Sequence, residues 1–489
     1  MGVKKRVKFL IICLTEQKGI LLMTILPNNS LLDHLYSKTF KAIAHIITPM
    51  NQNTSLDNYA DMIQNIDELM REAALALLKD SLEEMDEKFF NSQMRKRDYY
   101  VKMKRERTLI TLFGQVTFSR RIYESKSDGS YYIHVDRKMG LPKYDRYDPT
   151  VKAKVVEAYA NQNSMIKVGE IIGEFMYATF SRNEERKNFN ISRQTVYNIL
   201  KNAPKLMPNI DRQNQTPKTL YIMADEKYIP IQRSDKNNAM AKQLVLFEAI
   251  LGDDKRLSLQ NKIVFTRLHG NIWSQFHDYL STVYDLDKVE KIVVLGDGAN
   301  WIKFGRYELP KTEFVLDTFH GFQAINHITT DEGHRSDLRT NIFINNRNEF
   351  IEIVEDIKEE FKEEEKRLET IQNKFEYIIN NWQPIQRGLK DETPGCSMEA
   401  QISHNLAAVY TSRPKAYKID NLETYIYYRD LNQNNVDILN AYLKTFNDTK
   451  TDKAQYIEKE VIDLSFFDPK PRYDKSSTSN WLKGFISKH

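Results

Sequence analysis

The sequence predicts a multidomain protein of mixed α+β and α/β type, built around a mixed sheet with helices on its faces. At ~150 residues per domain, its 489 residues correspond to about three domains. Three apolar, β-branched segments follow one another at 220–232, 243–251 and 261–268, and strand-like and helix-like segments then alternate up to residue 317. Consecutive strands followed by alternating helices and strands are typical of such a sheet.

The composition narrows the class of protein. Charged residues make up 28% and apolar residues 41% of the chain, which excludes a membrane-embedded or broadly disordered protein. There are 71 Lys and Arg against 67 Asp and Glu, so the net charge is +4 and a polycation is excluded, although a local basic surface is not. Two cysteines exclude a disulfide framework or a Cys-rich zinc module and indicate a reducing compartment.

The N-terminus carries the most apolar segment, residues 9–26. Glu16, Gln17 and Lys18 interrupt it, so it reaches neither the ~18 apolar residues of a spanning helix nor the pattern of a signal peptide. One interpretation is that translation starts at Met23. In either case we expect a cytoplasmic protein without a membrane partner.

Residues 1–94 are expected to form a helical region, clearest at 63–90, where apolar residues recur three and four apart. Residues 95–145 form a basic segment, with ten Lys and Arg against three Asp and Glu between Arg95 and Lys126. Its alternating, β-branched stretch around Gly114 predicts a hairpin, which we expect to contact a phosphate backbone. The candidate contacts are Arg95, Lys96, Arg97, Lys104, Arg105, Arg107, Arg120 and Arg121. A solvated, charged sheet face explains this pattern equally well.

Residues 146–205 are predicted to form a helix-turn-helix. One helix is expected at 165–176, and a second is expected to begin with Ser192 as its N-cap. Ile191, Val196 and Leu200 would face inward. The expected DNA contacts on the second helix are Ser192, Arg193, Gln194 and Tyr197, as on a recognition helix. The connection at 177–190 is longer than the usual turn, and an ordinary capped surface helix is the alternative.

A helical segment interrupts the later part of the chain. Nine positions from Phe350 to Ile378 alternate in spacing between four and three, and eight of them are apolar, which predicts one long helix with a narrow apolar seam. Between Glu349 and Glu369 ten residues are acidic and four are basic. We expect this helix to be one arm of a solvated helical hairpin. Residues 431–489 carry no chemical signal.

Four carboxylates stand where site residues gather. Asp225 lies inside an apolar strand, Asp297 and Asp317 each end a strand, and Glu399 begins a helix. His320 follows Asp317 by three residues. Carboxylates brought together bind one or two Mg²⁺ ions, and two ions promote phosphodiester cleavage.

Simpler explanations exist for each position. The Asp297–Gly298 pair is typical of a turn, and a Glu at a helix start such as Glu399 is favoured by the helix dipole. Asp225 could be a structural ion pair, with Glu226 as the ligand instead. For His320, orienting a neighbour or packing in the core is favoured over metal binding. No phosphate-binding GxxxxGK[ST], GxSxG or HExxH motif is present.

Six segments, in chain order, carry a resemblance to a known family. They are RERTLITLFGQVTFSRRIYE, ISRQTVYNILK, ADEKYIPIQ, LGDGANWIK, LDTFHGFQAI and GCSMEAQISHNLAAVYTSRP. Over residues 95–414 the chain resembles the ISLre-type insertion-sequence transposases, which are similar to the Mutator-like DDE transposases.

The resemblance implies a ribonuclease-H-like core at 218–334 and 393–430, split by an all-helical insertion at 335–392. It further implies an acidic triad of Asp225, Asp297 and Glu399 that binds two Mg²⁺ or Mn²⁺ ions, with Asp317 and His320 in supporting roles. The implied activity is cleavage of double-stranded DNA at terminal inverted repeats and strand transfer into target DNA, by a homodimer or higher oligomer associated with the nucleoid. The alternatives are a catalytically inactive DNA-binding remnant or regulator, and a nuclease without strand transfer.

Overall fold

A computed structural model of the chain describes residues 59–162, 164–176, 191–206, 210–253, 256–390 and 394–456. The predictions for residues 9–26, Met23, 177–190 and 457–489 lie outside these ranges. The chain divides into two compact units, the first from residues 1–152, 169–192 and 443–489 and the second from 153–168 and 193–442. Among the described helices, none has the length and hydropathy needed to cross a membrane.

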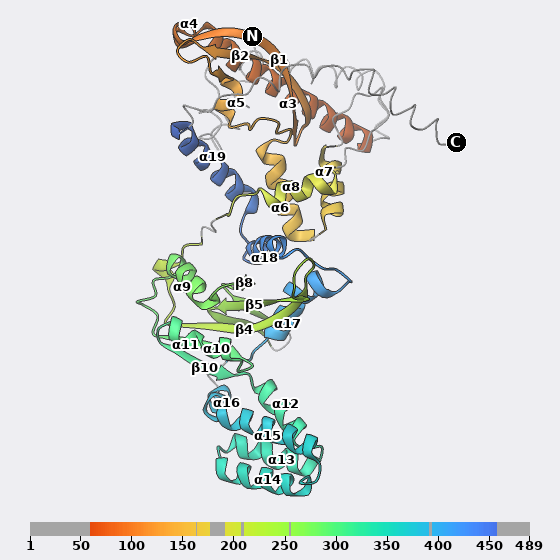
Figure 1. The fold of residues 1–489 in the computed structure, drawn as a ribbon, viewed down its shortest axis with the longest axis vertical. Helices are drawn as coiled ribbons and strands as arrows, with labels where there is room; N and C mark the ends of the chain where they lie inside the picture. Colours follow the sequence, from red (N-terminus) through yellow and green to blue (C-terminus); the bar gives the residue numbers. More distant parts are fainter. Residues whose placement is uncertain are drawn as a thin grey trace, which may run out of the picture. The chain divides into compact units, whose positions relative to one another are not determined.

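The first unit combines a long helix with a small antiparallel sheet (Figure 1). Its elements are α3 (Tyr59–Asn91), α4 (Gln93–Asp98), β1 (Tyr99–Thr111), β2 (Gly114–Ser125), β3 (Tyr131–Tyr132) and α5 (His134–Met139). The predicted N-terminal helix and the hairpin around Gly114 are confirmed, since Thr111 pairs with Gly114 at the turn. Gly114 has a φ of 121°, a conformation that favours glycine.

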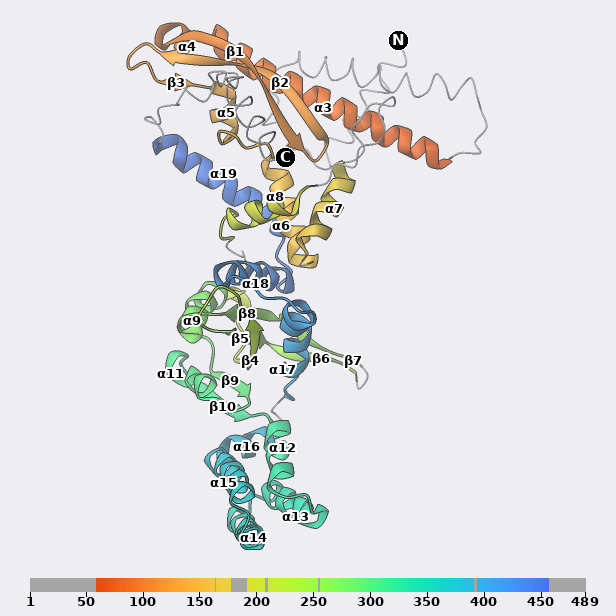
Figure 2. The same cartoon turned by 45° about the vertical axis from the view of Figure 1, so that its right-hand side comes forward.

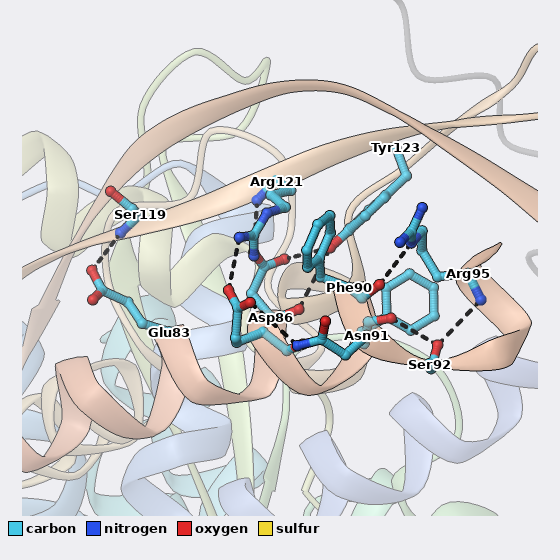
Figure 3. Close-up of polar contacts among 11 residues, drawn as sticks. Glu83, Asp86, Phe90, Asn91, Ser92, Arg95, Ser119, Arg121 and Tyr123 are labelled. Atoms are coloured by element: carbon cyan, nitrogen blue, oxygen red, sulfur yellow. Dashed lines mark hydrogen bonds and ion pairs between the residues drawn. The ribbon is translucent and has the colours of Figure 1, made fainter.

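Helix α3 packs along β2, and the small core between them contains Leu82, Val116 and Phe118. The carboxylates of Glu83 and Asp86 accept hydrogen bonds from the backbone N–H groups of Ser119 and Arg121 on β2, at 2.9 and 3.2 Å (Figure 3). Helix side chains thereby satisfy strand N–H groups that would otherwise be open to pairing with another chain.

Three helices follow: α6 (Pro149–Gln162), α7 (Met165–Met176) and α8 (Arg193–Lys201). The predicted helix at 165–176 is confirmed as α7. On α8, Val196 and Leu200 are buried while Arg193 and Gln194 are exposed, as predicted, and Ile191 just before it is also buried. Whether α7 and α8 act as a helix-turn-helix stays a prediction.

The second unit is built on a five-stranded mixed sheet in the order β10–β9–β4–β5–β8 (Figures 1 and 2). The strands are β4 (Thr219–Pro230), β5 (Asn238–Phe247), β8 (Ile263–Arg267), β9 (Lys291–Gly296) and β10 (Thr312–Leu316). Strands β4, β9 and β10 run parallel, and β5 is antiparallel to both β4 and β8. The predicted mixed sheet is confirmed. The segment 243–251, expected as one strand, divides between β5 and β6 (Ala249–Asp253), which pairs with β7 (Arg256–Gln260).

Helices cover both faces of this sheet. Alternate residues of β4, such as Leu220 and Ile222, belong to a core shared with Trp273 and Phe276 of α9 (Ile272–Val283). Two short helices, α10 (Asn300–Lys303) and α11 (Gly305–Glu308), lie between β9 and β10 in the chain. Helix α17 (Met398–Ile402) contacts β4 and continues as a π-helical segment, η3 (Ser403–Thr411). Helix α18 (Ile419–Gln433) contacts β8 and is followed in the chain by α19 (Ile438–Tyr456).

A helical insertion lies between β10 and α17 in the chain (Figure 2). It comprises α12 (Thr318–Ile328), α13 (Glu332–Phe343), α14 (Arg347–Glu360), α15 (Glu365–Asn380) and α16 (Trp382–Gly388). The prediction of one long helix through 350–378 is wrong, because the chain breaks at residues 361–364 into α14 and α15. The break contains the first two of the consecutive acidic residues 363–365. Phe350 before the break and Ile371 after it pack in the same hydrophobic core. The apolar spacing therefore continues across the turn, and the sequence pattern does not reveal that the helix is broken there.

Candidate active site

The pairing of three neighbouring parallel strands ends at one level, although β4 itself continues to Pro230. Ala224 of β4 pairs with Gly296 of β9, which pairs with Leu316 of β10. The next residue in each segment is an aspartate. These are Asp225, Asp297 and Asp317. Because the three strands are parallel and paired in this register, the three aspartates stand side by side where the pairing ends.

A cavity of about 420 Å³ lies at this edge, and all five predicted site residues line it. They are Asp225, Asp297, Asp317, His320 and Glu399. Phe319 and Cys396, which the sequence did not single out, line it too. Residues separated by up to 174 positions in the chain thus meet in one site.

Strand alternation separates Asp225 from its neighbour Glu226. Asp225 faces the cavity, whereas Glu226 accepts a 2.6 Å hydrogen bond from the indole N–H of Trp301 on α10. Successive side chains of a strand point to opposite faces, so only one of the two can line the site. In this geometry Asp225 therefore lines the cavity and Glu226 does not.

Two of the aspartates in the cavity have raised pKa values. The pKa of Asp225 is raised to about 6, mainly by burial; the negative charges of Asp297 and Glu226 contribute to this rise, and the hydrogen bond from the Glu226 N–H opposes it. Burial also raises the pKa of Asp317; Glu399 and Asp297 act in the same direction, and His320 in the opposite one. For both aspartates burial is therefore the largest cause of the raised pKa, and the neighbouring carboxylates add to it.

Asp297 stands in a tight turn. Its Oδ1 accepts a 2.9 Å hydrogen bond from the N–H of Ala299, and Gly298 between them has a φ of 88°. The turn expected for the Asp297–Gly298 pair is therefore compatible with a site residue, because the turn directs the Asp297 side chain toward the cavity.

Asp317 caps α12 by accepting a 3.1 Å hydrogen bond from the N–H of Phe319. Nδ1 of His320 lies 4.0 Å from Oδ2 of Asp317 and, among the described residues, has no hydrogen-bond partner. His320 therefore neighbours Asp317 rather than packing away from the site, in agreement with a supporting role that stays a prediction.

Glu399 comes from helix α17, which follows the helical insertion in the chain. It is exposed, and its helix α17 is fixed by the buried Met398 and by the N–H of Ser397, which donates to Sδ of Met223 at 3.3 Å.

Burial raises the pKa of the Cys396 thiol to about 12, so that thiol stays neutral near pH 7 and is a poor nucleophile or metal ligand.

The donor chemistry of the cavity suits a hard cation such as Mg²⁺ or Mn²⁺, since its four acidic side chains offer only oxygen ligands. In the described ranges, no three His, Cys, Asp or Glu side chains are already grouped closely enough to hold an ion together. Of the four acidic side chains, only that of Glu399 is exposed.

Two of the arginines predicted to contact DNA are buried inside the protein. Arg107 and Arg120 are only 8% and 6% exposed, and both pair with Asp136 of α5, at 2.6 and 2.9 Å. Arg107 also donates to the carbonyls of Pro142 and Asp145. The prediction that these two arginines form a DNA-binding surface is wrong, because strand alternation turns them toward the core.

Arg121 is also engaged within the first unit. Its guanidinium pairs with Asp86 and Glu87 of α3, each at 2.7 Å, and lies 4.2 Å from the ring centre of Phe90 (Figure 3). Arg95 lies over the same ring at 4.7 Å and donates to the Phe90 carbonyl. These contacts tie α3, α4 and β2 together.

The other predicted basic contacts stand nearer the surface. Arg97 is exposed and pairs with Asp98, and Lys96 and Lys104 are exposed. Arg105 is half-buried. On α8, Ser192, Arg193 and Gln194 are exposed, whereas the Tyr197 hydroxyl donates to Asn421 of α18 at 3.5 Å.

Comparisons with known proteins place the chain in a family. Residues 54–440 match a family described as "Uncharacterised protein family (UPF0236)". A UPF0236 protein of Caldanaerobacter subterraneus subsp. tengcongensis is 26% identical over 399 residues, which cover 78% of this chain and 79% of that protein. Another from this organism, whose name joins eleven locus designations, is 26% identical over 387 residues, 78% of this chain and 79% of its own.

A third relative, from Streptococcus gallolyticus, is named "UPF0236 protein in vanSb 3'region". It is 24% identical over 359 residues, covering 71% of this chain and 76% of that protein. The family match spans far more than half of the chain. The chain therefore belongs to the UPF0236 family.

Proposed function

We propose that this protein is the DNA transposase of an insertion sequence, which binds terminal inverted repeats and performs metal-dependent DNA cleavage and strand transfer. The observation that carries the proposal is the alignment of Asp225, Asp297 and Asp317, each one residue beyond the paired positions of three neighbouring parallel strands, in one cavity with Glu399.

The sheet supports a ribonuclease-H-like core. Four of its strands run in one direction and only β5 runs against them, in the order β10–β9–β4–β5–β8. This order agrees with the core that the resemblance implies, and the helical insertion before Glu399 agrees with its implied interruption.

In this proposal Asp225, Asp297 and Glu399 hold two Mg²⁺ or Mn²⁺ ions. Bound there, the ions would activate the attacking oxygen and stabilise the leaving oxygen of the phosphodiester. The turn at Asp297–Ala299 directs the Asp297 side chain toward the ions. Asp317 and His320, which lie beside each other, have a supporting role at the neighbouring position of the cavity. The neutral Cys396 thiol takes no part in the chemistry.

Two basic regions are proposed to bind the DNA. One is the exposed side of the first unit, with Lys96, Arg97 and Lys104, and the other is the start of α8, with Arg193 and Gln194. Contacts of this kind neutralise phosphates and weaken with salt. Two transposon ends must be joined to one target, so we propose a homodimer or a higher oligomer.

The family also supports a mobile element. The name of one relative joins eleven locus designations of a single organism. Repeated copies of one coding sequence are expected of an element that moves.

The test uses the full-length protein, Mn²⁺ or Mg²⁺, and linear DNA carrying the ends of the element that encodes it. We expect wild-type protein to cleave and join these ends, and Asp297→Asn to bind them without cleaving. Cleavage by Asp297→Asn at the wild-type rate would refute the site. Binding without cleavage by wild-type protein would favour the inactive regulator, and cleavage without joined products would favour the nuclease.

A further inference from the structure

The helical insertion reaches into the candidate active site. The hydroxyl of Tyr377, on α15, donates a 2.6 Å hydrogen bond to the backbone carbonyl of Asp297. The strand pairing of β9 ends one residue earlier, at Gly296, so the Asp297 carbonyl lies beyond the ladders to β4 and β10. Tyr377 thus supplies a donor where the sheet has stopped supplying one.

The turn after Asp297 packs tightly against the same part of the insertion. A methyl group on Gly298 would lie 3.0 Å from Cδ1 of Leu316 and 3.4 Å from Oδ1 of Asn381. Asn381 is buried and donates through Nδ2 to the Tyr377 carbonyl at 2.7 Å. Its Oδ1 is buried and, within the described part of the chain, accepts no hydrogen bond. Tyr377 and Asn381 are therefore joined, and both border the Asp297 turn.

The end of β10 is held by the next helix of the insertion. Arg387 of α16 donates to the Phe314 carbonyl at 3.0 Å and pairs with Glu313 at 2.8 Å. Gly388 approaches so closely that a methyl group there would lie 2.9 Å from the Leu316 carbonyl oxygen. The insertion therefore borders the two strand ends that carry Asp297 and Asp317.

We propose that Tyr377 is a positioning residue for Asp297, through which the helical insertion sets the geometry of the carboxylate site. This inference rests on the proposed function for its chemical consequence, since it concerns how that site is built. A hydrogen bond to the Asp297 carbonyl fixes the peptide plane between Asp297 and Gly298, and with it the direction in which the aspartate side chain leaves the turn.

The helix that carries Tyr377 suits it to this role. Its position on a sixteen-residue helix in the insertion core gives it a rigid base.

The experiment compares Tyr377→Phe with a matched control, Tyr428→Phe, in the full-length protein. The Tyr428 hydroxyl also donates to a backbone carbonyl, that of Pro204 at 3.2 Å, but from α18, whose residues do not line the cavity. Two readouts are used: hydrogen–deuterium exchange of the peptide spanning 296–302, and Mn²⁺ binding followed by titration calorimetry.

We expect Tyr377→Phe to accelerate exchange in this peptide and to weaken Mn²⁺ binding about tenfold, the lower end of the effect of residues that orient metal ligands. We expect Tyr428→Phe to change neither. Unchanged exchange in Tyr377→Phe would overturn the anchoring role, and accelerated exchange with unchanged Mn²⁺ affinity would overturn the positioning role.

Failure of the proposed function is recognised separately. Wild-type protein that neither binds Mn²⁺ nor cleaves element ends would refute the proposed function, and the positioning role with it. The exchange readout would still decide whether Tyr377 anchors the Asp297 turn.

Discussion

Replacing Asp225 by Asn should stabilise the protein while removing a proposed metal ligand. The folded-state pKa of Asp225 is about 6, raised first by burial and then by Asp297 and Glu226, against an ordinary value of 3.8. Between these two values the folded state binds a proton that the unfolded chain does not, so stability falls as pH rises through this interval. Above pH 6 the full cost is present, and Asn avoids it while retaining Oδ1 to accept the Glu226 N–H.

The magnitude follows from the pKa difference. About 2.2 units at ~1.4 kcal/mol each give an upper limit of ~3 kcal/mol. Because the side chain is partly open to the cavity, solvent screening reduces the expected gain to about 1–2 kcal/mol. This gain should be present at pH 7.5 and absent at pH 3.5, below both pKa values.

The assay is urea denaturation followed by tryptophan fluorescence, because Trp273, Trp301 and Trp382 report on the second unit. Asp235→Asn, at an exposed position in the turn after β4, is the control and should change stability little at any pH. A variant at Asp225 that is no more stable than wild type at pH 7.5, or whose gain is independent of pH, would refute the argument.

Two further predictions concern the basic residues. Arg107→Ala should destabilise the protein by about 3 kcal/mol or more, because it breaks a buried pair with Asp136. Lys104→Ala, at an exposed position, should change stability by less than about 0.5 kcal/mol. Thermal denaturation measures both effects, and equal effects would contradict the conclusion that Arg107 is internal and Lys104 is on the surface. Binding of element-end DNA, measured by fluorescence anisotropy over a salt series, should weaken steeply with salt, and Lys104→Ala should reduce the slope of log K against log salt by about 0.9 if Lys104 contacts one phosphate. An unchanged slope would remove Lys104 from the interface.

The sequence predicts the mixed sheet and the residues that line the cavity because both depend on local signals. Apolar, β-branched runs mark β4, β9 and β10; Asp297 and Asp317 follow the last residues of β9 and β10, whereas Asp225 lies inside β4. That the three aspartates share one register cannot be derived from any single segment, because register arises from pairing between strands. The structure brings Asp225, Asp297 and Asp317 together through that pairing.

Other features depend on contacts that sequence spacing does not encode. Arg107 and Arg120 belong to a basic run, yet strand alternation and the distant Asp136 bury them. The heptad pattern persists from α14 to α15 across a turn, since both helices face one core. Tyr377 has no neighbouring motif, and its contact with Asp297 spans 80 positions.

The proposed function depends above all on a divalent-metal site formed by Asp225, Asp297 and Glu399. The most direct measurement is anomalous diffraction from crystals of the protein grown with Mn²⁺. We expect anomalous peaks in the cavity, bounded by Asp225, Asp297 and Glu399, and their loss in Asp297→Asn crystals. Mn²⁺ bound only elsewhere on the protein, or an empty cavity at saturating Mn²⁺, would contradict the claim.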